Sequence, residues 1–317
     1  MSEVILNMLL LTPDEKREFE TIAPDAEHLY CQGRDADEEQ LANATVILGW
    51  PRPEILCKAE KLKWIQTMWA GSEEYTGEGV LPHGVILTAS NGVNCKGVAE
   101  YMLACLLALC RRITYYRDLQ HQHCWQHGDA YGNTAKTVIG STVLVVGAGN
   151  IGSNFAELCR GMGAHTIGVK RTVNGPVEGF DELYEVEQLE RLLPIADVVA
   201  LCMPHNEQTV GLINEKRLRL MRNDAILINA GRGSVIDQEA LVRLMRAGKL
   251  WGAALDVMLP EPLPDDHPLW EVPNLLITPH VAGAMRIDIT RRRAVELAEE
   301  NLRRYVNGEK LCNIVRR

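Results

Sequence analysis

The sequence predicts an α/β protein of two domains, each built on a doubly wound parallel sheet. Short apolar, β-rich runs alternate with helix-length segments of mixed polarity along most of the chain. The runs are almost continuously apolar, which is typical of parallel strands buried on both faces. The 317 residues exceed the roughly 100–200 of one domain. We therefore expect a domain of residues 95–283 inserted into a smaller domain of residues 1–94 and 284–317.

The first part of the chain predicts a small α/β unit and then a long helical segment. Residues 1–94 contain the apolar runs VILNMLLL, ATVILGW, KLKWIQTM and VILTAS, each followed by Pro, Gly or Asn. A helical pattern then runs from Lys96 to Gln126, which indicates one long helix or two adjoining ones. Its Val98–Cys110 part is too apolar for water if it lies outside the core. We expect it to pack on the same helix of a second copy in a homodimer.

The rest of the chain predicts the larger sheet. Six more β-rich runs are separated mostly by helix-like segments: TVLVVGAGNIG, HTIGVK, ADVVALCM, AILINAG, WGAALDVM and NLLITPH. Strands and helices that alternate in this way build a doubly wound parallel sheet. The last segment, MRIDITRRRAVELAEENLRRYVNG, is typical of a charged amphipathic helix that ends at Gly308.

Composition excludes several classes of protein. The 33 Lys and Arg against 42 Asp and Glu give a formal charge of −9, the wrong sign for a nucleic-acid-binding chain. The longest apolar run, YMLACLLALC, is far shorter than the ~20 residues of a membrane span. The N-terminal stretch has Glu3 in place of a basic region, and the nine cysteines form no CxxC pair. We therefore expect a cytoplasmic protein with reduced thiols and with no nucleic-acid or membrane partner.

The segment GAGNIG predicts a dinucleotide-binding turn. It follows the apolar run STVLVV and opens a helix-like stretch, which is the context that this fingerprint has in a Rossmann-like domain. Gly147 would allow the tight turn, Gly149 the approach of the pyrophosphate, and Gly152 the close packing of the helix. Asn150 and Ile151 begin that helix, where free N–H groups and the helix dipole favour a phosphate.

The end of the next strand, IGVKRT, selects between the two nicotinamide cofactors. An NAD site normally carries an Asp or Glu here, about 20 residues beyond the glycines, to hold the ribose 2′-hydroxyl. This chain has Lys170, Arg171 and Thr172 instead, and these groups would pair with a 2′-phosphate. We therefore expect NADP(H) in preference to NAD(H). The alternative is that the two cations belong to a solvated loop end.

Three later segments carry a candidate active site: LINAGRGSVID, AALDVMLPEPLPDDHPLW and NLLITPHVAG. Loops that follow parallel strands meet at one edge of the sheet, so Arg232, Glu261 and His280 would lie near one another. The order N-x-x-R-G, D-V-x-x-x-E-P and T-P-H resembles the D-isomer-specific 2-hydroxyacid dehydrogenases, over nearly the whole chain. The resemblance implies two Rossmann-like domains, of which the smaller is flavodoxin-like and binds substrate. It also implies NADPH-dependent reduction of a small 2-oxo acid, of the glyoxylate or hydroxypyruvate class, to the D-2-hydroxy acid.

This reaction needs a hydride donor, a proton donor at the carbonyl oxygen and a cation for the carboxylate. His280 suits the proton donor because histidine titrates close to neutral pH. Glu261 would bind its imidazole, orient it and keep the protonated form available. Arg232 would bind the substrate carboxylate and polarise the carbonyl through its planar guanidinium.

The resemblance implies further contacts. Those with the cofactor would come from Met203, Pro204 and Thr209, from Ala230 and Gly231, and from Asp256, which would face the nicotinamide carboxamide or else cap a loop. Those with the substrate would come from Trp69, Ala70, Gly71 and Ser72. Ser72, Glu73 and Glu74 depart from the pattern of many family members, which have a hydrophobic residue and Asp after the Ala-Gly pair. Candidate pocket walls are Trp50, Met285 and Arg286, with a core position equally open for Trp50. Val98 and Glu100 would lie at a hinge, and His205 would be a plain loop histidine.

Other interpretations stay open at this point. The motif HQHCWQH offers His121, His123, Cys124 and His127 to a metal, but only His123 and His127 would share a helix face, so we expect no metal. A bulkier 2-oxo acid is a second candidate substrate. Phosphoglycerate is disfavoured because no regulatory domain follows the last helix, and formate because a glutamate partners the histidine. A nucleotide-sensing protein that resembles the C-terminal-binding-protein corepressors is the non-enzymatic alternative.

Overall fold

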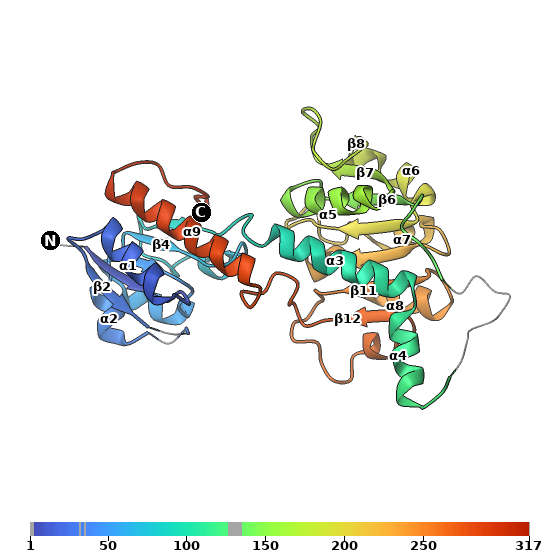
Figure 1. Ribbon diagram of the computed structural model, residues 1–317, viewed down its shortest axis with the longest axis horizontal. Helices are drawn as coiled ribbons and strands as arrows, with labels where there is room; N and C mark the ends of the chain where they lie inside the picture. The colour runs from blue at the N-terminus through green and yellow to red at the C-terminus, as the bar shows by residue number, and fades with distance from the viewer. Residues whose placement is uncertain (1–2, 32, 35, 126–134, 317) are drawn as a thin grey trace. The chain divides into compact units, whose positions relative to one another are not determined.

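The chain folds into two compact units. The computed structural model describes residues 3–31, 33–34, 36–125 and 135–316. Unit 1 comprises Met1–Asn94 and Met285–Arg317, and unit 2 comprises Cys95–Ala284. Each unit has its own sheet (Figure 1). The chain therefore crosses between the units twice, after Asn94 and after Ala284.

Unit 1 is built on a five-stranded parallel sheet of order β2-β1-β3-β4-β5. The strands are β1 (Val4–Asn7), β2 (Glu27–Tyr30), β3 (Val46–Leu48), β4 (Trp64–Gln66) and β5 (Ile86–Thr88). This order is that of flavodoxin-like sheets, with the switch point between β1 and β3. The C-terminal segment continues the sheet beyond β5, since Thr88 forms an antiparallel bridge with Ile314.

Helices cover both faces of the first sheet. On one face lie α1 (Pro13–Ile22) and α9 (Asp288–Val306), and on the other lies α2 (Glu38–Asn43). Successive strand residues face opposite sides, so Ile5 packs with α1 and α9 whereas Leu6 packs with α2. Trp64 of β4 stacks on Tyr305 of α9 with ring centroids 5.2 Å apart. The last helix therefore belongs to the core of unit 1, although it follows unit 2 in the sequence.

Unit 2 is built on a seven-stranded parallel sheet of order β12-β11-β10-β9-β6-β7-β8. The strands are β6 (Thr142–Val146), β7 (His165–Lys170), β8 (Glu182–Glu185), β9 (Val198–Leu201), β10 (Ile226–Asn229), β11 (Gly252–Leu255) and β12 (Leu275–Ile277). The strand order turns back between β6 and β9, the switch point at which Rossmann-like sheets bind dinucleotides. The two parallel sheets confirm the predicted doubly wound α/β class.

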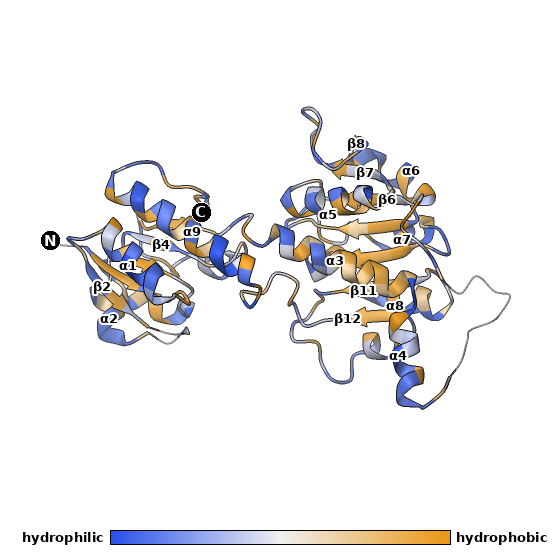
Figure 2. Cartoon of the chain, viewed as in Figure 1, coloured by the Kyte–Doolittle hydropathy of each residue, from blue (hydrophilic) through white to orange (hydrophobic). Residues whose placement is uncertain are grey.

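Helices also cover both faces of the second sheet. One face carries α3 (Cys95–Cys110) and α5 (Asn150–Gly161), and the other carries α6 (Leu189–Leu192), α7 (Glu215–Leu220) and α8 (Gln238–Arg246). All residues of β9, β10 and β11 are buried between these layers. Figure 2 shows these strands as apolar and the covering helices as mixed, which is why the strands read as continuous apolar runs in the sequence.

The long helical segment forms two helices, α3 and α4 (Ile113–His121), which separate at Arg112 with a left-handed φ of +53°. Val98 and Met102 of α3 are buried in the core of unit 2. The core of unit 2 therefore covers the inner face of α3, and the packing of this helix on a second copy stays a prediction for its other face. The predicted hinge residues Val98 and Glu100 lie near the start of α3, close to the first crossing. In the described part of the chain, no helix is long and apolar enough to cross a membrane.

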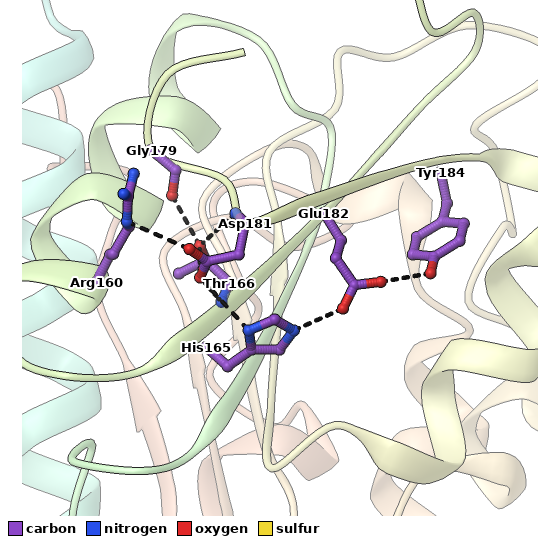
Figure 3. A network of polar contacts seen from close by, with 7 residues as sticks. All are labelled: Arg160, His165, Thr166, Gly179, Asp181, Glu182 and Tyr184. Carbon is purple, nitrogen blue, oxygen red and sulfur yellow. Dashed lines mark hydrogen bonds and ion pairs between the residues drawn. The ribbon is translucent and has the colours of Figure 1, made fainter. Parts of the chain in front are cut away.

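The sequence pattern does not predict two of the strands, β2 and β8, and both lie at a sheet edge. Both strands pair on one side only and carry glutamate, so they lack the continuous apolar run that the edge strand β12 has. Polar contacts hold the start of β8 (Figure 3). His165 Nε2 lies 2.8 Å from Glu182 Oε1, and Asp181 Oδ2 accepts the N–H of Thr166 at 2.9 Å. Arg160 Nε of α5 lies 3.3 Å from Asp181 Oδ1.

Candidate active site

The turn after β6 leaves no room for side chains at two of its three glycines. Gly147 has a φ of +104°, and a Cβ there would lie 2.9 Å from the carbonyl carbon of Cys202. A Cβ on Gly152 would lie 2.3 Å from the oxygen of Gly147, so only glycine lets α5 pack this closely. A Cβ on Gly149 would meet no described atom within 4 Å. The backbone at Gly149 is therefore open to the approach of a ligand.

The start of α5 is suited to a pyrophosphate. Gly149 is the N-cap, and no side chain of the described residues caps the helix. The N–H groups of the first turn, which includes Asn150 and Ile151, are thus not occupied by a capping side chain. A phosphate accepts such N–H groups, and the helix dipole favours its charge. These residues fit the phosphates of a nicotinamide dinucleotide.

The end of β7 carries the residues predicted to select the cofactor. Lys170 is the last residue of the strand and is half-buried, and Arg171 and Thr172 are exposed. On the neighbouring strand, Glu185 is in register with Lys170, and its Oε1 lies 3.4 Å from the N–H nitrogen of Val173. The strand end thus combines two cations and a hydroxyl with one carboxylate on β8.

Met203, the second residue after β9, joins the glycine turn to the loop after β10. A Cβ at Gly147 would lie 3.1 Å from Met203 Cγ, and a Cβ at Gly231 would lie 2.7 Å from Met203 O. The N–H of Ala230 donates to Leu201 O at 3.2 Å. The loops after β6, β9 and β10 therefore touch one another at the carboxyl edge of the sheet.

The loop beyond Met203 is closed by its own polar groups. Thr209 Oγ1 donates to Pro204 O at 2.7 Å and accepts the N–H of Asn206 at 2.9 Å. His205 Nδ1 lies 2.8 Å from Ser234 Oγ. The hydroxyl of Thr209 and the imidazole of His205 thus both have partners within the protein.

The loop after β10 presents Arg232. Asn229 is buried at the end of β10, where its Oδ1 accepts the N–H of Gly231 at 3.1 Å and its Nδ2 donates to Arg232 O at 3.0 Å. The half-buried Arg232 side chain donates from Nη1 to Gly231 O at 2.8 Å. A Cβ on Gly233 would lie 2.1 Å from the carbonyl carbon of Met258. The Arg232 loop therefore rests directly on the loop after β11.

Glu261 joins that second loop to His280. Its Oε1 accepts the N–H of Met258 at 2.9 Å, and its Oε2 lies 2.8 Å from His280 Nδ1. An ionised carboxylate can only accept, so Nδ1 carries the hydrogen and Nε2 is left for a ligand. The His280 side chain is 51% exposed. Gln238 of α8 supports the loop, since its Oε1 accepts the N–H of Leu259 at 2.9 Å.

Asp256, the residue after β11, fastens the loop that carries His280. Its Oδ1 accepts the N–H of Val281 at 2.9 Å and the hydroxyl of Thr278 at 2.6 Å, and its Oδ2 accepts the N–H of Ala282 at 2.9 Å. Its carbonyl oxygen accepts the N–H of His280 at 2.8 Å. Asp256 is 1% exposed, so in this structure its carboxylate caps a loop.

The predicted substrate residues Trp69, Ala70, Gly71 and Ser72 lie in unit 1 and follow β4. All four are half-buried. The N–H of Ser90 donates to Trp69 O at 3.0 Å, and the Trp50 ring lies edge-on to the Trp69 ring with centroids 6.2 Å apart. This stretch is therefore held both by its backbone and by an aromatic pair.

The acidic residues after Ser72 are partly neutralised. Glu74 Oε2 accepts from Arg34 Nη2 at 2.7 Å, and Arg34 Nε donates to Trp50 O at 3.2 Å. Met285 is buried in the core of unit 1, whereas Arg286 is exposed. The departure from the family pattern at Glu74 thus comes with a cation that offsets its charge.

The histidine-rich motif does not continue a helix. The helix α4 ends at His121, and His123 has a left-handed φ of +53°. The expectation that His123 lies on a helix face is therefore wrong, and His127 lies outside the described residues. Among residues 3–31, 33–34, 36–125 and 135–316, no three His, Cys, Asp or Glu side chains could hold a metal ion.

Three residues organise the site without having been predicted: Asn229, Gly233 and Gln238. The bond from Asn229 to the N–H two residues ahead is an Asx turn, so the N-x-x-R-G spacing already held a signal for it. Gly233 directly follows the candidate arginine, and a glycine there signals a close approach of backbone. Gln238 carries no such signal, because its partner Leu259 is 21 residues away.

Comparison with known proteins gives concordant matches. The family model described as D-isomer-specific 2-hydroxyacid dehydrogenase, NAD-binding domain, matches residues 103–282. A glyoxylate reductase of Thermofilum pendens is 35% identical over 257 residues, 81% of this chain and 75% of that protein. A D-isomer-specific 2-hydroxyacid dehydrogenase family protein of Aeromonas salmonicida superposes with a TM-score of 0.87 at 28% identity, covering 100% of this chain and 99% of that one. A family member from Xanthobacter autotrophicus, solved with NADPH and MES, has a TM-score of 0.79 at 28% identity, covering 100% and 98%.

Proposed function

The chain belongs to the D-isomer-specific 2-hydroxyacid dehydrogenases, a family of oxidoreductases, and we propose that it reduces a small 2-oxo acid to the D-2-hydroxy acid with NADPH. The proposed substrates are of the glyoxylate or hydroxypyruvate class. The 35% sequence identity to the Thermofilum pendens glyoxylate reductase supports this choice. The balanced reaction consumes a 2-oxo acid, NADPH and a proton and yields the 2-hydroxy acid and NADP⁺.

Three side chains perform the proposed chemistry around the reacting carbonyl. When bound, the cofactor supplies the hydride. His280 donates a proton from Nε2 to the carbonyl oxygen, because its Nδ1 is held by Glu261 at 2.8 Å. Glu261 orients the imidazole and stabilises its cationic form. Arg232 binds the substrate carboxylate and polarises the carbonyl, and in the reverse direction His280 accepts the proton.

One continuous set of contacts carries this proposal. Gly233, next to Arg232, packs on Met258, whose N–H donates to Glu261, which in turn binds His280. These residues follow β10, β11 and β12, which are neighbours in the sheet. A cation, a carboxylate and an open imidazole are thus fixed at one sheet edge, as proton transfer beside a bound carboxylate requires.

The preference for NADPH is part of the proposal. Lys170 and Arg171 at the end of β7 provide two cations for a 2′-phosphate, with Thr172 beside them. The crystallised Xanthobacter relative holds NADPH. The proposed cofactor contacts are Gly147, Gly149, Asn150, Ile151, Gly152, Lys170, Arg171, Thr172, Met203, Pro204, Thr209, Ala230, Gly231 and Asp256. The proposed substrate contacts beyond Arg232 and His280 are Trp69, Ala70, Gly71 and Ser72.

The test is turnover by the purified chain. The loss of absorbance of NADPH, and then of NADH, is followed against glyoxylate, hydroxypyruvate and bulkier 2-oxo acids. His280→Ala and Arg232→Ala should each lower kcat/KM by about 100-fold or more. The exposed His83→Ala and Arg219→Ala are matched controls that should not change it. If none of these acids caused oxidation of NADPH or NADH, the proposed reaction would be overturned in favour of a nucleotide sensor.

We also propose a cytoplasmic homodimer. All nine cysteines lie in the described part of the chain, and none of them forms a disulfide bond there, which suits a reducing compartment. The proposed contact extends from the outer face of α3 onto α4, where every residue is described, none is buried, and Ile113 is 56% exposed. Sedimentation as a monomer at micromolar concentration would contradict the dimer.

A further inference from the structure

The loop of residues 278–282 holds His280 in an unfavourable backbone conformation. Its φ of +53° lies in the left-handed region, which non-glycine residues adopt only where the surroundings fix it. Asp256 supplies that fixation through its carbonyl oxygen and both carboxylate oxygens. The direction of the imidazole therefore depends on how firmly Asp256 and this loop are joined.

The contacts of Asp256 give a direction to the hydrogen bonds behind it. Two backbone N–H groups already donate to its carboxylate, so the carboxylate is an acceptor, and Thr278 donates its single hydroxyl hydrogen to it at 2.6 Å. Thr278 Oγ1 is also hydrogen-bonded to the hydroxyl of Tyr101. Since Thr278 has no second hydrogen to give, Tyr101 must be the donor in this bond.

The surroundings of Tyr101 keep it a donor. Tyr101 lies on α3, and burial raises the pKa of its phenol well above the usual range, with the neighbouring Cys105 adding to the increase. Burial also raises the pKa of the Cys105 thiol. The negative charge of Asp256 raises the pKa of the Tyr101 phenol further. The phenol thus stays protonated through the neutral range.

The bond between Tyr101 and Thr278 joins the first helix of unit 2 to a loop near the end of that unit. The helix α3 starts at Cys95, directly after the first crossing of the chain, and Thr278 lies shortly before the second crossing after Ala284. The bond between Tyr101 and Thr278 joins residues 177 positions apart. It therefore ties the first helix of unit 2 to the loop that presents His280.

We propose that Tyr101 is a positioning residue of this enzyme, which fixes the backbone of residues 278–282 through Thr278 and Asp256 and so directs the His280 imidazole toward Glu261. Its effect on catalysis rests on the proposed function, whereas its effect on the loop does not. Tyr101 itself takes no part in proton transfer to the substrate.

The test removes only the hydroxyl, as Tyr101→Phe. We expect kcat to fall about tenfold, because a misdirected imidazole slows transfer, while the Kd for NADPH changes less than about twofold. In the protein without ligands, amide exchange at Val281 and Ala282 should accelerate about tenfold as the loop loosens. The matched control is Tyr184→Phe, which loses a hydroxyl that donates to Glu182 on β8 and should change neither quantity.

A double variant tests whether Tyr101 acts on the loop through Thr278. If Tyr101 acts through Thr278, then Tyr101→Phe combined with Thr278→Val should be no slower than Thr278→Val alone. Thr278→Ser, which keeps the hydroxyl, should retain native kcat and exchange, and Thr278→Ala, which lacks it, takes the place of Thr278→Val if that variant does not fold.

The two proposals fail separately. Unchanged exchange at Val281 and Ala282 in Tyr101→Phe would overturn the positioning role, whatever the activity. Faster exchange in a chain whose native form reduces no 2-oxo acid would support the positioning role and overturn the proposed reaction. Additive effects of the Tyr101 and Thr278 substitutions would overturn the route through Thr278.

Discussion

A methyl group added at Gly233 should separate the two loops that support the proposed reaction. A Cβ there would lie 2.1 Å from the carbonyl carbon and 2.2 Å from the carbonyl oxygen of Met258, whereas ordinary contact starts at 3.4 Å. Both atoms are backbone and cannot rotate away, so Gly233→Ala must move the loops apart by about 1 Å.

That movement acts directly on Glu261. The N–H of Met258 donates to Glu261 Oε1 at 2.9 Å, so a Met258 that is displaced by about 1 Å carries the Glu261 side chain with it or strains this bond. In either case the other oxygen of Glu261 is displaced from His280. A misplacement of this size costs about 100-fold in rate, or about 2.7 kcal/mol of activation free energy. The turn at Gly147 is untouched, so NADPH affinity should stay within about threefold of the native value.

The assay is steady-state kcat with the best 2-oxo acid, together with NADPH binding measured by fluorescence. Gly161→Ala is the matched control, because a Cβ at this helical position meets no described atom within 4 Å and alanine is the better helix former. Gln238→Ala loosens the same loop without adding atoms and should cost about tenfold. A Gly233→Ala enzyme with kcat within threefold of native would refute this reasoning.

Three other predictions concern the cofactor and acid stability. The double variant Lys170→Ala with Arg171→Ala should lower the NADPH-to-NADH ratio of kcat/KM by about 10- to 100-fold, at about 1.4 kcal/mol per decade; an unchanged ratio would show that neither cation reaches the 2′-phosphate. Gly152→Ala should abolish NADPH binding in calorimetry while the circular dichroism stays native, because its Cβ would lie 2.3 Å from a backbone oxygen. The pKa of Asp181 is lowered, chiefly by the N–H of Thr166, so its contribution to stability is present above about pH 4 and is lost as the pH falls through the folded-state pKa. The unfolding free energy of Asp181→Asn, measured by urea titration, should therefore fall less steeply than that of the native chain between about pH 4 and 2. The same pH dependence in both proteins would contradict this.

Strands that are buried on both faces are the easiest to predict from the sequence, although the half-buried edge strand β12 is also predicted. VVAL of β9 and ILIN of β10 have no exposed residue, so burial alone produces their apolar runs. EHLY of β2 and ELYE of β8 lie at sheet edges, where charged residues keep the free side in solvent. The break between α3 and α4 falls at Arg112, which is neither proline nor glycine, and the helical pattern therefore left one helix or two undecided.

The residues of the candidate site also fall into those that the sequence indicates and those that only the structure indicates. Arg232, Glu261 and His280 can be proposed from the sequence because their residue types suit the proposed chemistry and the loops that hold them follow neighbouring strands. Tyr101 acts only through a contact with a residue 177 positions away, and nothing in its local pattern distinguishes it from any other tyrosine on a helix. Residues whose effect is purely geometric need the folded chain to be recognised, whereas residues with their own reactivity do not.

The double crossing of the chain has a consequence for biosynthesis. The face of the first sheet that α9 covers needs Ala294, Ala298 and Leu302 for its core, and these residues are translated only after all of Cys95–Ala284. At about 5–20 residues per second the ribosome takes roughly 10 s or more over that stretch. During this interval the first sheet of the nascent chain lacks the cover of α9 while the second sheet is still being translated. We expect chaperones that bind apolar surface to act at this stage.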